Sequence, residues 1–564
     1  MMKTKLILFL LLLIPIIISA LVKQQSKQHA PLDAFSEDSS YAYYGSASEW
    51  GRQMFSASSV ESSYKRRGQR QLLAILDGKP QEAITMCQEY LMKDPNDTEQ
   101  FFMLTLAWLA LDDLAKAQEY MQQAVNKGMP FERFLAGPRQ LLKPLTKSEL
   151  FQKLYKVFQN QLIHGPMLGS MTDKSVRFWL RTFDEVPVAL KIFSDQDNFE
   201  PILTDPVYTR SDQDYTAIVE IKNLQANQIY SYDILINGKP VVRSPYASFK
   251  TFPEVGKGSH FRVAFGGGAG YTPKYEYMWE TIISREPEAL LFLGDNVYID
   301  LPEMPGAFHD YTYYRRQSRP EYRLLIQSIP VFAIWDDHDS AINDVWLGPY
   351  IDKPRWKLPL LNVFKMNWNN PGYGIDSCPG CWFKFTIADV DFFMLDCRFY
   401  RTNPLLETTS MLGSLQKEWL FHELTKSTAT FKVLVSSVPW AQNTKPGSLD
   451  TWDGYAGERE EIFTYIEKER INGIFLLSAD RHRSDIWKIE RKNGYDLYEF
   501  ESSKLTNMHT HKIMPDALFG YNEKCSFGLL SFDTTKEDPE VRYQIISIDN
   551  EPVYSLTLNK SQLK

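Results

Sequence analysis

The chain has 564 residues, which is too long for a single hydrophobic core, so we expect about three domains. It carries 62 Lys and Arg residues against 70 Asp and Glu residues, which gives a net charge of −8 at pH 7. This mild acidity argues against nucleic-acid-specific binding. Aromatic residues make up 14% of the chain, which favours β-rich folded domains over disorder.

The N-terminus has the pattern of an export signal. Lys3 and Lys5 precede an apolar run from Leu6 to Val22. This pattern predicts a signal peptide or signal anchor over residues 1–22, at the lower length limit for crossing a bilayer. A flexible tether, rich in Ser, Gln, Ala and Tyr, is expected over 23–60. We therefore expect an exported protein of the periplasm, cell envelope or medium, with the apolar segment as a membrane anchor if it is not cleaved.

The next region, residues 61–160, is predicted to be helical and contains an internal repeat. Ala83 and Ala117 are 34 residues apart, and so are Cys87 and Met121. This spacing resembles tetratricopeptide units, in which small residues let two helices approach closely. The expected packing positions are Phe101, Leu104, Trp108, Ala117, Met121 and Ala124. Such a region either binds a protein partner or acts as a spacer packed on a neighbouring domain.

Residues 161–255 have a different pattern, in which short alternating segments are separated by Pro, Asp, Asn and Gly. The segments include SVRFWLRT, PVALKIF and YTAIVEI. They predict an all-β sandwich similar to a fibronectin type III domain, without evident chemistry of its own.

From residue 256 to 564 apolar strands alternate with helical stretches. The expected strands are FRVAF, ALLFLGD, VFAIWDD, VDFFMLD, FKVLVSS and GIFLLSAD. Several of them end in a polar or acidic residue. The pattern predicts an α/β domain whose sheet is buried on both faces, with functional groups in the loops at the carboxyl ends of the strands.

Three of these strand ends carry most of the candidate chemistry. Their sequences are Gly294-Asp295-Asn296-Val297-Tyr298, Asp336-Asp337-His338-Asp339 and Ala479-Asp480-Arg481-His482. Carboxylates that lie close together repel one another, and a divalent or trivalent cation removes that penalty. Oxygen and imidazole ligands suit Fe, Mn, Zn or Ca. Each Asp alone could instead cap a helix, so the metal hypothesis depends on all three strand ends together.

A glycine-rich loop, Gly266–Tyr271, follows the first strand of this domain. It lacks the third glycine of a dinucleotide fingerprint, because that position is Tyr271, and no Gly-Lys-Ser/Thr of a P-loop follows. The backbone N–H groups of Gly267 and Gly268 remain candidates for an anion-binding nest.

The motifs in this order resemble the calcineurin-like metallophosphoesterase superfamily and, within it, the alkaline phosphatase D (PhoD-like) family. LGDNVY is similar to the GD-x-x-Y motif, WDDHD to the WDDHE form of GNH(E/D), and SADRH to the GDRH form of GHxH. The phrases MLDCRFYRT and DTWDGYAGER are also similar to the family. The resemblance runs from Leu162 to near the C-terminus. It implies a four-layer β-sandwich flanked by helices and preceded by the fibronectin III-like domain. The expected order of the chain is thus a short all-α repeat, the fibronectin III-like domain and the α/β catalytic domain.

The same resemblance implies the roles of individual residues. One or two metal ions (Fe, Ca, Mn or Zn) would be held by Asp295, Tyr298, Asp337, Asp480 and His482. The catalytic residues would be His338 as general acid, Asp339 to steer it, and Arg481 on the phosphate. Substrate-binding candidates are Asn296, Arg398, Gly267 and Gly268. Two family motifs have lost ligands here, because the glycine loop replaces Asp-x-His and VLVSSVPW lacks the expected His.

The function expected from these observations is hydrolysis of phosphate esters by an exported metal-dependent phosphoesterase. The alternative is a catalytically weak phosphatase-like module of the cell envelope, with the helical repeat as its partner-binding element. The five cysteines leave one further question open, because Cys378 and Cys381 could form a local disulfide or serve as two loop residues without a catalytic task.

Overall fold

The computed structural model describes residues 66–158, 161–196, 198–241, 247–302, 305–375 and 377–564. The expected signal segment (1–22) and tether (23–60) lie outside these residues. Within the described ranges, no helix combines the length and the apolar character needed to span a membrane.

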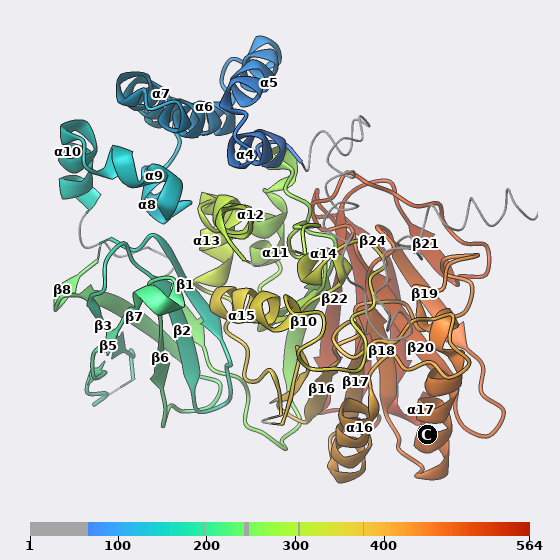
Figure 1. Ribbon diagram of the computed structural model, residues 1–564. Coiled ribbons are helices and arrows are strands. Elements are labelled where there is room, and N and C mark those ends of the chain that lie inside the picture. The colour runs from blue at the N-terminus through green and yellow to red at the C-terminus, as the bar shows by residue number, and fades with distance from the viewer. Residues whose placement is uncertain (1–65, 159–160, 197, 242–246, 303–304, 376) are drawn as a thin grey trace, which may run out of the picture.

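The described chain begins with a helical region, drawn in blue and teal at the upper left of Figure 1. Consecutive helices contact one another from α4 to α7, and Ala83, Ala117 and Ala124 are fully buried between them. Trp108 is only partly buried, with the Lys116 ammonium 3.7 Å from its ring centre. The tetratricopeptide resemblance stays a prediction. The helices are α4 (Gln69–Leu76), α5 (Pro80–Lys93), α6 (Thr98–Ala110), α7 (Leu114–Asn126), α8 (Glu132–Ala136), α9 (Arg139–Thr146) and α10 (Glu149–Phe158).

The β-rich region that follows consists of two antiparallel sheets packed face to face. Phe178 of one sheet meets Tyr232 of the other edge-on, with ring centres 4.9 Å apart. The likeness to fibronectin type III stays a prediction. One sheet has the order β1 (His164–Gly169), β2 (Val176–Arg181), β6 (Thr216–Ile221). The other contains β3 (Pro187–Phe193), β4 (Ile202–Leu203), β5 (Val207–Tyr208), β7 (Ile229–Ile236), β8 (Lys239–Pro240) and β9 (Ser248–Lys250).

The C-terminal region contains two larger sheets. The six-stranded sheet has the order β12 (Val331–Ile334), β11 (Ala289–Leu293), β10 (His260–Gly266), β22 (Ser526–Asp533), β23 (Glu540–Ser547), β24 (Pro552–Asn559). The seven-stranded sheet has the order β15 (Phe383–Ile387), β16 (Val390–Met394), β17 (Phe431–Val435), β18 (Ile474–Ser478), β20 (Leu497–Ser502), β19 (Ser484–Ile489), β21 (Phe519–Tyr521). The motif-bearing strands, expected in one sheet, are therefore divided between two.

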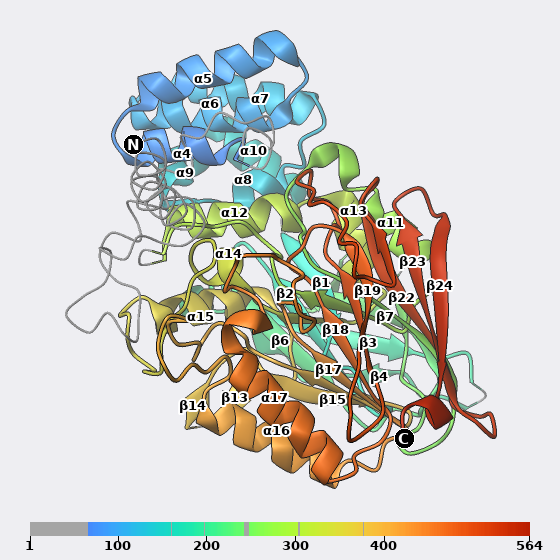
Figure 2. The same ribbon diagram turned by 90° about the vertical axis from the view of Figure 1, so that its right-hand side faces the viewer.

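These two sheets pack against each other and are covered by helices on their outer faces (Figures 1 and 2). Between the sheets, Phe332 stacks on Phe385 with ring centres 3.9 Å apart. Helices α11 (Met278–Ser284), α13 (Pro320–Ile326) and α15 (Lys357–Asn367) cover the six-stranded sheet, and α16 (Ser414–Lys426) and α17 (Ala456–Lys468) cover the other. The result is the expected mixed α/β fold in four layers: helices, sheet, sheet, helices.

The helical region shares a hydrophobic core with the C-terminal region. Phe102 of α6 stacks on Tyr311 of α12 (Ala307–Gln317), with ring centres 6.4 Å apart. The same core contains Val297, Ile299 and Leu301, which follow the motif strand β11. The helices therefore pack directly behind one of the predicted site loops.

All five cysteines are buried free thiols, Cys378 and Cys381 included. The local disulfide considered for this pair is therefore not formed in the structure. Cys378 instead begins a short strand, β14 (Cys378–Pro379), which pairs with β13 (Gly374–Ile375).

The shared core predicts that the helical region and the site loop lose their order together. Phe102→Ala should destabilise the fold by about 3–5 kcal/mol, because a large buried side chain is replaced by a cavity. Limited proteolysis should then cut both the helices and residues 297–301. Met92→Ala on α5 is the control, since its side chain is 77% exposed. Cleavage confined to the helices, with 297–301 still protected, would contradict the coupling.

Candidate metal centre

The ends of four strands meet at one edge of the sandwich, and glycines make that approach possible. A Cβ atom added to Gly267, after β10, would lie 2.7 Å from the Cβ of Ala479 and 3.0 Å from the carbonyl oxygen of Gly294. A Cβ atom on Gly294 would collide with Asp336. The loops after β10, β11, β12 and β18 are therefore in contact, although they come from both sheets.

The candidate ligands on these loops lie at sharp turns of the chain. The φ angles of Asp295, Asp480 and His482 are 51°, 74° and 48°, in the left-handed region that non-glycine residues rarely adopt. Such strained backbone is concentrated at functional sites, where the surrounding structure holds it in place.

Asp295 is the centre of the first group of donors. Its Oδ2 accepts a hydrogen bond from the Tyr298 hydroxyl at 2.8 Å and lies 3.6 Å from Nε2 of His482. The Tyr298 hydroxyl is in turn 3.2 Å from the same nitrogen of His482. Three of the predicted ligands, from the loops after β11 and β18, are thus brought together.

Asp337 and His338 form the second group, at the start of α14 (Asp337–Ser340). Ligand atoms of Asp295, Asp337 and His338 all lie within 4.8 Å of one another, and all three residues are buried. Asp480 lies on the neighbouring loop, where its Oδ2 accepts a hydrogen bond from Arg481 at 3.3 Å. Burial raises the pKa of Asp336 to about 8, and the charge of Asp480 adds to this effect.

The donor set fits a cation on physical grounds. Burial, opposed by His338 and reinforced by Asp337 and Asp336, raises the pKa of Asp295 well above its usual range. Its Oδ1 atom is buried and has no hydrogen-bond partner among the described residues. Burial and the neighbouring Asp295 likewise raise the pKa of Tyr298. A metal ion would reverse these penalties, because it stabilises the charged forms of carboxylate and phenol.

His338 is held by a partner that the sequence did not indicate. Its Nδ1 pairs with Oδ1 of Asp300 rather than with the expected Asp339. Burial opposes the charged imidazole, but Asp300, Asp337 and Asp295 outweigh it and raise the pKa of His338 to about 10. The protonated ring has the state that a general acid requires.

The role expected for Asp339 is therefore corrected. Its carboxylate accepts hydrogen bonds from the backbone N–H groups of Asn296, Val297 and Asp336, at 3.0–3.2 Å. It ties the loop after β11 to the loop after β12. Asn296 has a similar structural task, because it is buried and its side-chain amide donates to the carbonyl of Ile334 at 2.9 Å. Its Oδ1 atom has no hydrogen-bond partner among the described residues, so the expected contact of Asn296 with substrate stays a prediction.

Arg398 is also reassigned. Its guanidinium is fully buried and donates to Asp336 at 2.5 Å and to Asp450 at 2.6 Å. These carboxylates accept the guanidinium hydrogen bonds that Arg398 was expected to donate to a phosphate. Arg398 therefore acts as the counter-ion of buried acidic residues. Arg481, which lies beside Asp480 at the strand ends, keeps its predicted place near the metal ligands.

The glycine loop does not form the expected anion nest. The N–H of Gly267 donates to the carbonyl of Ser502 at 2.9 Å, and that of Gly268 donates to Gly294 at 3.2 Å. The next N–H, of Ala269, donates to Asp295 at 2.8 Å. Because backbone carbonyls take up these donors, Gly267 and Gly268 act through close packing and not through substrate binding.

Several residues near the site were missed from the sequence. Asp300 lies two positions after Tyr298, and the His-Thr-His spacing of 509–511 is a recognisable pair of potential ligands. The ligand atoms of His482, His509 and His511 lie within 4.8 Å of one another. Asn507 links this group to the first, because its Nδ2 donates to the Tyr298 hydroxyl at 2.6 Å.

The helical region reaches the same loop. Arg66 donates to the carbonyl of Tyr298 at 2.9 Å, and its guanidinium pairs with Asp300, while Gln69 donates to the same carbonyl at 2.8 Å. Both Arg66 and Asp300 are buried. A chain of contacts therefore runs from the helices through Asp300 to His338.

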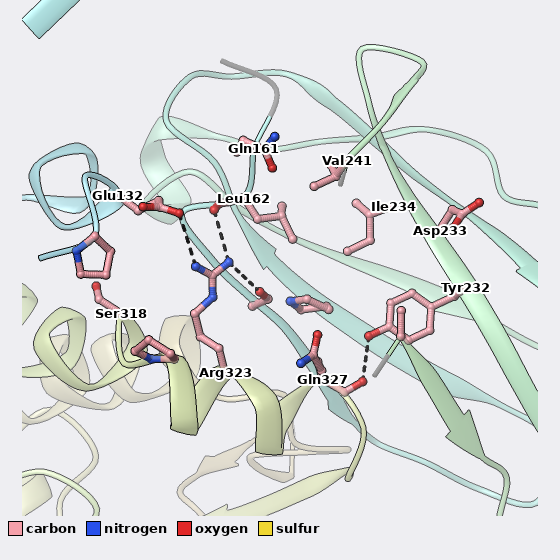
Figure 3. A pocket seen from close by; sticks show the side chains of 15 residues that line it. Glu132, Gln161, Leu162, Tyr232, Asp233, Ile234, Val241, Ser318, Arg323 and Gln327 are labelled. Carbon is pink, nitrogen blue, oxygen red and sulfur yellow. Dashed lines mark hydrogen bonds and ion pairs between the residues drawn. The ribbon is translucent and has the colours of Figure 1, made fainter. Parts of the chain in front are cut away.

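A pocket of about 360 Å³ lies elsewhere, where the helical region, the β-rich region and α13 meet (Figure 3). Arg323 crosses it, 3.7 Å from Glu132, and donates to the carbonyls of Leu162 and Gly165. Tyr232 donates to the carbonyl of Gln327 at 2.8 Å. None of the predicted ligands lines this pocket, so we read it as a junction between the three parts.

The four-layer sandwich, with carboxylate, imidazole and phenol donors at its strand ends, is the arrangement expected of a metal-dependent phosphoesterase. Comparison with known families agrees. Residues 372–537 match the model of the PhoD-like phosphatase family, and residues 159–254 match a domain of unknown function (DUF7800). The match over residues 372–537 confirms the resemblance to the PhoD-like family seen in the sequence.

Individual relatives support this assignment. Over 403 residues the chain is 23% identical to alkaline phosphatase D of Bacillus subtilis (strain 168), covering 60% of this chain and 67% of the relative. The structure of PhoD has a similar fold, with a TM-score of 0.58 and 17% identity over 71% of this chain and 90% of that chain. Purple acid phosphatase PPD1 from yellow lupin (Lupinus luteus) seeds is also similar, with a TM-score of 0.51 and 11% identity over 71% and 75% of the two chains.

The contacts of His338 predict an effect that depends on the leaving group of the substrate. Asp300→Asn should lower kcat for alkyl phosphate esters by about 10²-fold, since general acids contribute ~10²- to 10⁴-fold. It should affect p-nitrophenyl esters much less, because p-nitrophenolate leaves without protonation. Arg66→Ala should also lower the rate on alkyl esters more than the rate on p-nitrophenyl esters, but by a smaller factor than Asp300→Asn. The rates are measured on paired alkyl and aryl esters.

The neighbouring Arg67 provides the control for Arg66. It pairs with Asp97 inside the helical region, so Arg67→Ala should leave the ratio of alkyl to aryl rates unchanged. Equal losses on both ester types in Asp300→Asn would show that this residue supports the fold and does not position the general acid.

Proposed function

We propose that the chain is an exported metal-dependent phosphoesterase of the alkaline phosphatase or phosphodiesterase type. The observation that carries the proposal is Asp295, whose buried carboxylate joins Tyr298 and His482 and keeps one oxygen without a hydrogen-bond partner among the described residues. The names of the relatives, alkaline phosphatase D and purple acid phosphatase, support the same reaction class. The proposed export rests on residues 1–22 alone.

The residues divide into groups with different tasks. Asp295, Tyr298, Asp337, Asp480 and His482 would hold the metal. A bound cation supplies Lewis acidity, which neutralises phosphoryl oxygens and lowers the pKa of water. His338, oriented by Asp300 through Nδ1, would give the proton on Nε2 to the leaving oxygen of the ester. Arg481 would contribute charge-assisted hydrogen bonds to the phosphate.

The alternative function, a weakly catalytic module that binds a partner through its helices, has less support. Helix α4 contacts α12, and Phe102 of α6 stacks on Tyr311 of α12, in the hydrophobic core that also contains residues 297, 299 and 301. Ligand atoms of Asp295, Asp337 and His338 lie within 4.8 Å of one another, which supports the enzymatic function. A partner on the outer face of the helices is compatible with the enzymatic function but adds nothing to it.

Removal of the central carboxylate tests the proposal. Asp295→Asn should lower hydrolysis of bis(p-nitrophenyl) phosphate and p-nitrophenyl phosphate by at least about 10³-fold, because metal ions supply several kcal/mol of transition-state stabilisation. Bound metal, measured by elemental analysis, should fall with it. Asp549→Asn is the control, since Asp549 forms a partly exposed ion pair with Lys524.

Chelation gives the second arm of this test. Wild-type protein stripped of metal should lose activity and regain it when one of Fe, Mn, Zn or Ca is returned. Wild-type protein that hydrolyses both esters without any bound metal would refute the metal-dependent mechanism. Protein that binds metal but cleaves neither ester would favour the alternative function.

Tyr298 predicts a spectroscopic signature. A phenolate oxygen is a hard donor that prefers a trivalent ion, so iron-loaded protein should show a visible charge-transfer band. The band should vanish in Tyr298→Phe and persist in Tyr313→Phe, where the altered phenol is buried on α12. A colourless protein with a full complement of iron, or a band that survives Tyr298→Phe, would exclude Tyr298 as a ligand.

A further inference from the structure

The segment 502–511 lies directly on the glycine loop. Besides the bond from the N–H of Gly267 to Ser502, the N–H of Leu505 donates to the carbonyl of Gly267 at 3.1 Å. The hydroxyl of Thr506 donates to the carbonyl of Gly270 at 2.8 Å. Hydrogen bonds to Gly267 and to Gly270 therefore hold the segment against both ends of the glycine loop.

The glycines make room for this segment. A Cβ atom on Gly268 would collide with the carbonyl oxygen of Ser503, and one on Gly270 would lie 3.1 Å from Cγ of Asn507. A loop that carried its own side-chain ligands would have to push segment 502–511 away. The glycine loop can therefore pack against segment 502–511 only because it lacks side-chain ligands.

The segment brings two imidazoles to a predicted metal ligand. The ring centres of His509 and His511 lie 5.0 Å and 5.5 Å from that of His482. The Nε2 atoms of His509 and His511 are 3.1 Å apart. This separation suits two nitrogens bound to one ion, since each metal–nitrogen distance is about 2.0–2.1 Å.

The three imidazoles are continuous with the rest of the centre. His482 belongs to this group and also lies beside Asp295 and Tyr298, as described above. Asn507, two residues before His509, accepts a hydrogen bond from the N–H of His509 at 3.0 Å and donates to Tyr298. The backbone that carries His509 is thereby tied to the first group of donors.

We propose that His509 and His511 bind the same metal ion as His482 and replace the side chains that the glycine loop lacks. This inference rests on the proposed function and adds to it, because it specifies the metal class. A position with three imidazoles selects a transition metal such as Zn, Fe or Mn over Ca, which takes oxygen ligands almost exclusively.

The test uses metal-free full-length protein titrated with Zn²⁺ against a chromophoric chelator. The double variant His509→Ala/His511→Ala should lose more than about 100-fold in Zn²⁺ affinity at one site, because loss of mere outer-shell partners already costs ~10- to 100-fold. The visible spectrum of the Co²⁺-loaded protein should change as well. His422→Ala is the control, since this histidine is exposed on α16.

A second variant separates metal binding from folding. His509→Gln/His511→Gln retains hydrogen-bonding groups but removes both imidazoles, so it should lose the same affinity while its thermal unfolding stays that of the wild type. An unchanged Zn²⁺ affinity and Co²⁺ spectrum in both double variants would overturn the inference.

The outcomes also separate this inference from the proposed function. If the wild type cleaves phosphate esters with bound metal while the double variants keep their affinity, only the histidine assignment fails. If the wild type binds Zn²⁺ through these histidines but cleaves no ester, the proposed function fails and the assignment stands. Wild-type protein that takes up no metal would overturn both.

Discussion

The site depends on how a group of buried carboxylates is neutralised. Asp336 and Asp450 share Arg398, and Asp344 has Lys445 at 2.7 Å, so these acids carry their counter-ions within the protein. Removing a buried cation of this kind typically costs about 3–5 kcal/mol, because it leaves an uncompensated charge. Asp295 is different, since burial raises its pKa and one of its oxygens has no hydrogen-bond partner among the described residues. The structure thus separates the carboxylates that are balanced by Arg398 and Lys445 from Asp295, which is not.

Close approach of the loops is the second constraint, and it explains the departure from the family motifs. The loops after β10, β11 and β18 can meet only because Gly267 and Gly294 lack side chains. Because Gly268 and Gly270 also lack side chains, segment 502–511 can lie directly on the glycine loop. If His509 and His511 bind metal as proposed, ligands lost from one part of the chain are supplied from another, about 240 residues later, without a change in the sandwich. A missing motif residue is therefore weak evidence for a missing metal.

The sequence predicted what depends on local patterns and missed what depends on partners far apart in the chain. Apolar strands ending in Asp295, Asp337 and Asp480 could be read directly, because burial and strand ends have local signatures. The partner of His338 could not be predicted from such local patterns. Asp339, next to it in sequence, bonds backbone N–H groups, whereas Asp300 reaches the imidazole from another loop. Arg398 was misassigned for the same reason, since its carboxylate partners lie 62 and 52 residues away.

The N-terminal helical region also holds part of the candidate site in place. A repeat at the N-terminus suggested a separate adaptor, yet Arg66 and Gln69 both donate to the backbone carbonyl of Tyr298. Arg66 also pairs with Asp300, the partner of His338. Asp300 is buried between Arg66, in the turn just before α4, and the imidazole of His338 on the sandwich. Detaching the helical region would therefore remove one of the two partners of its charge. The residues 298–300 are held from two sides, so the position of the candidate general acid depends on helices that carry no catalytic group of their own.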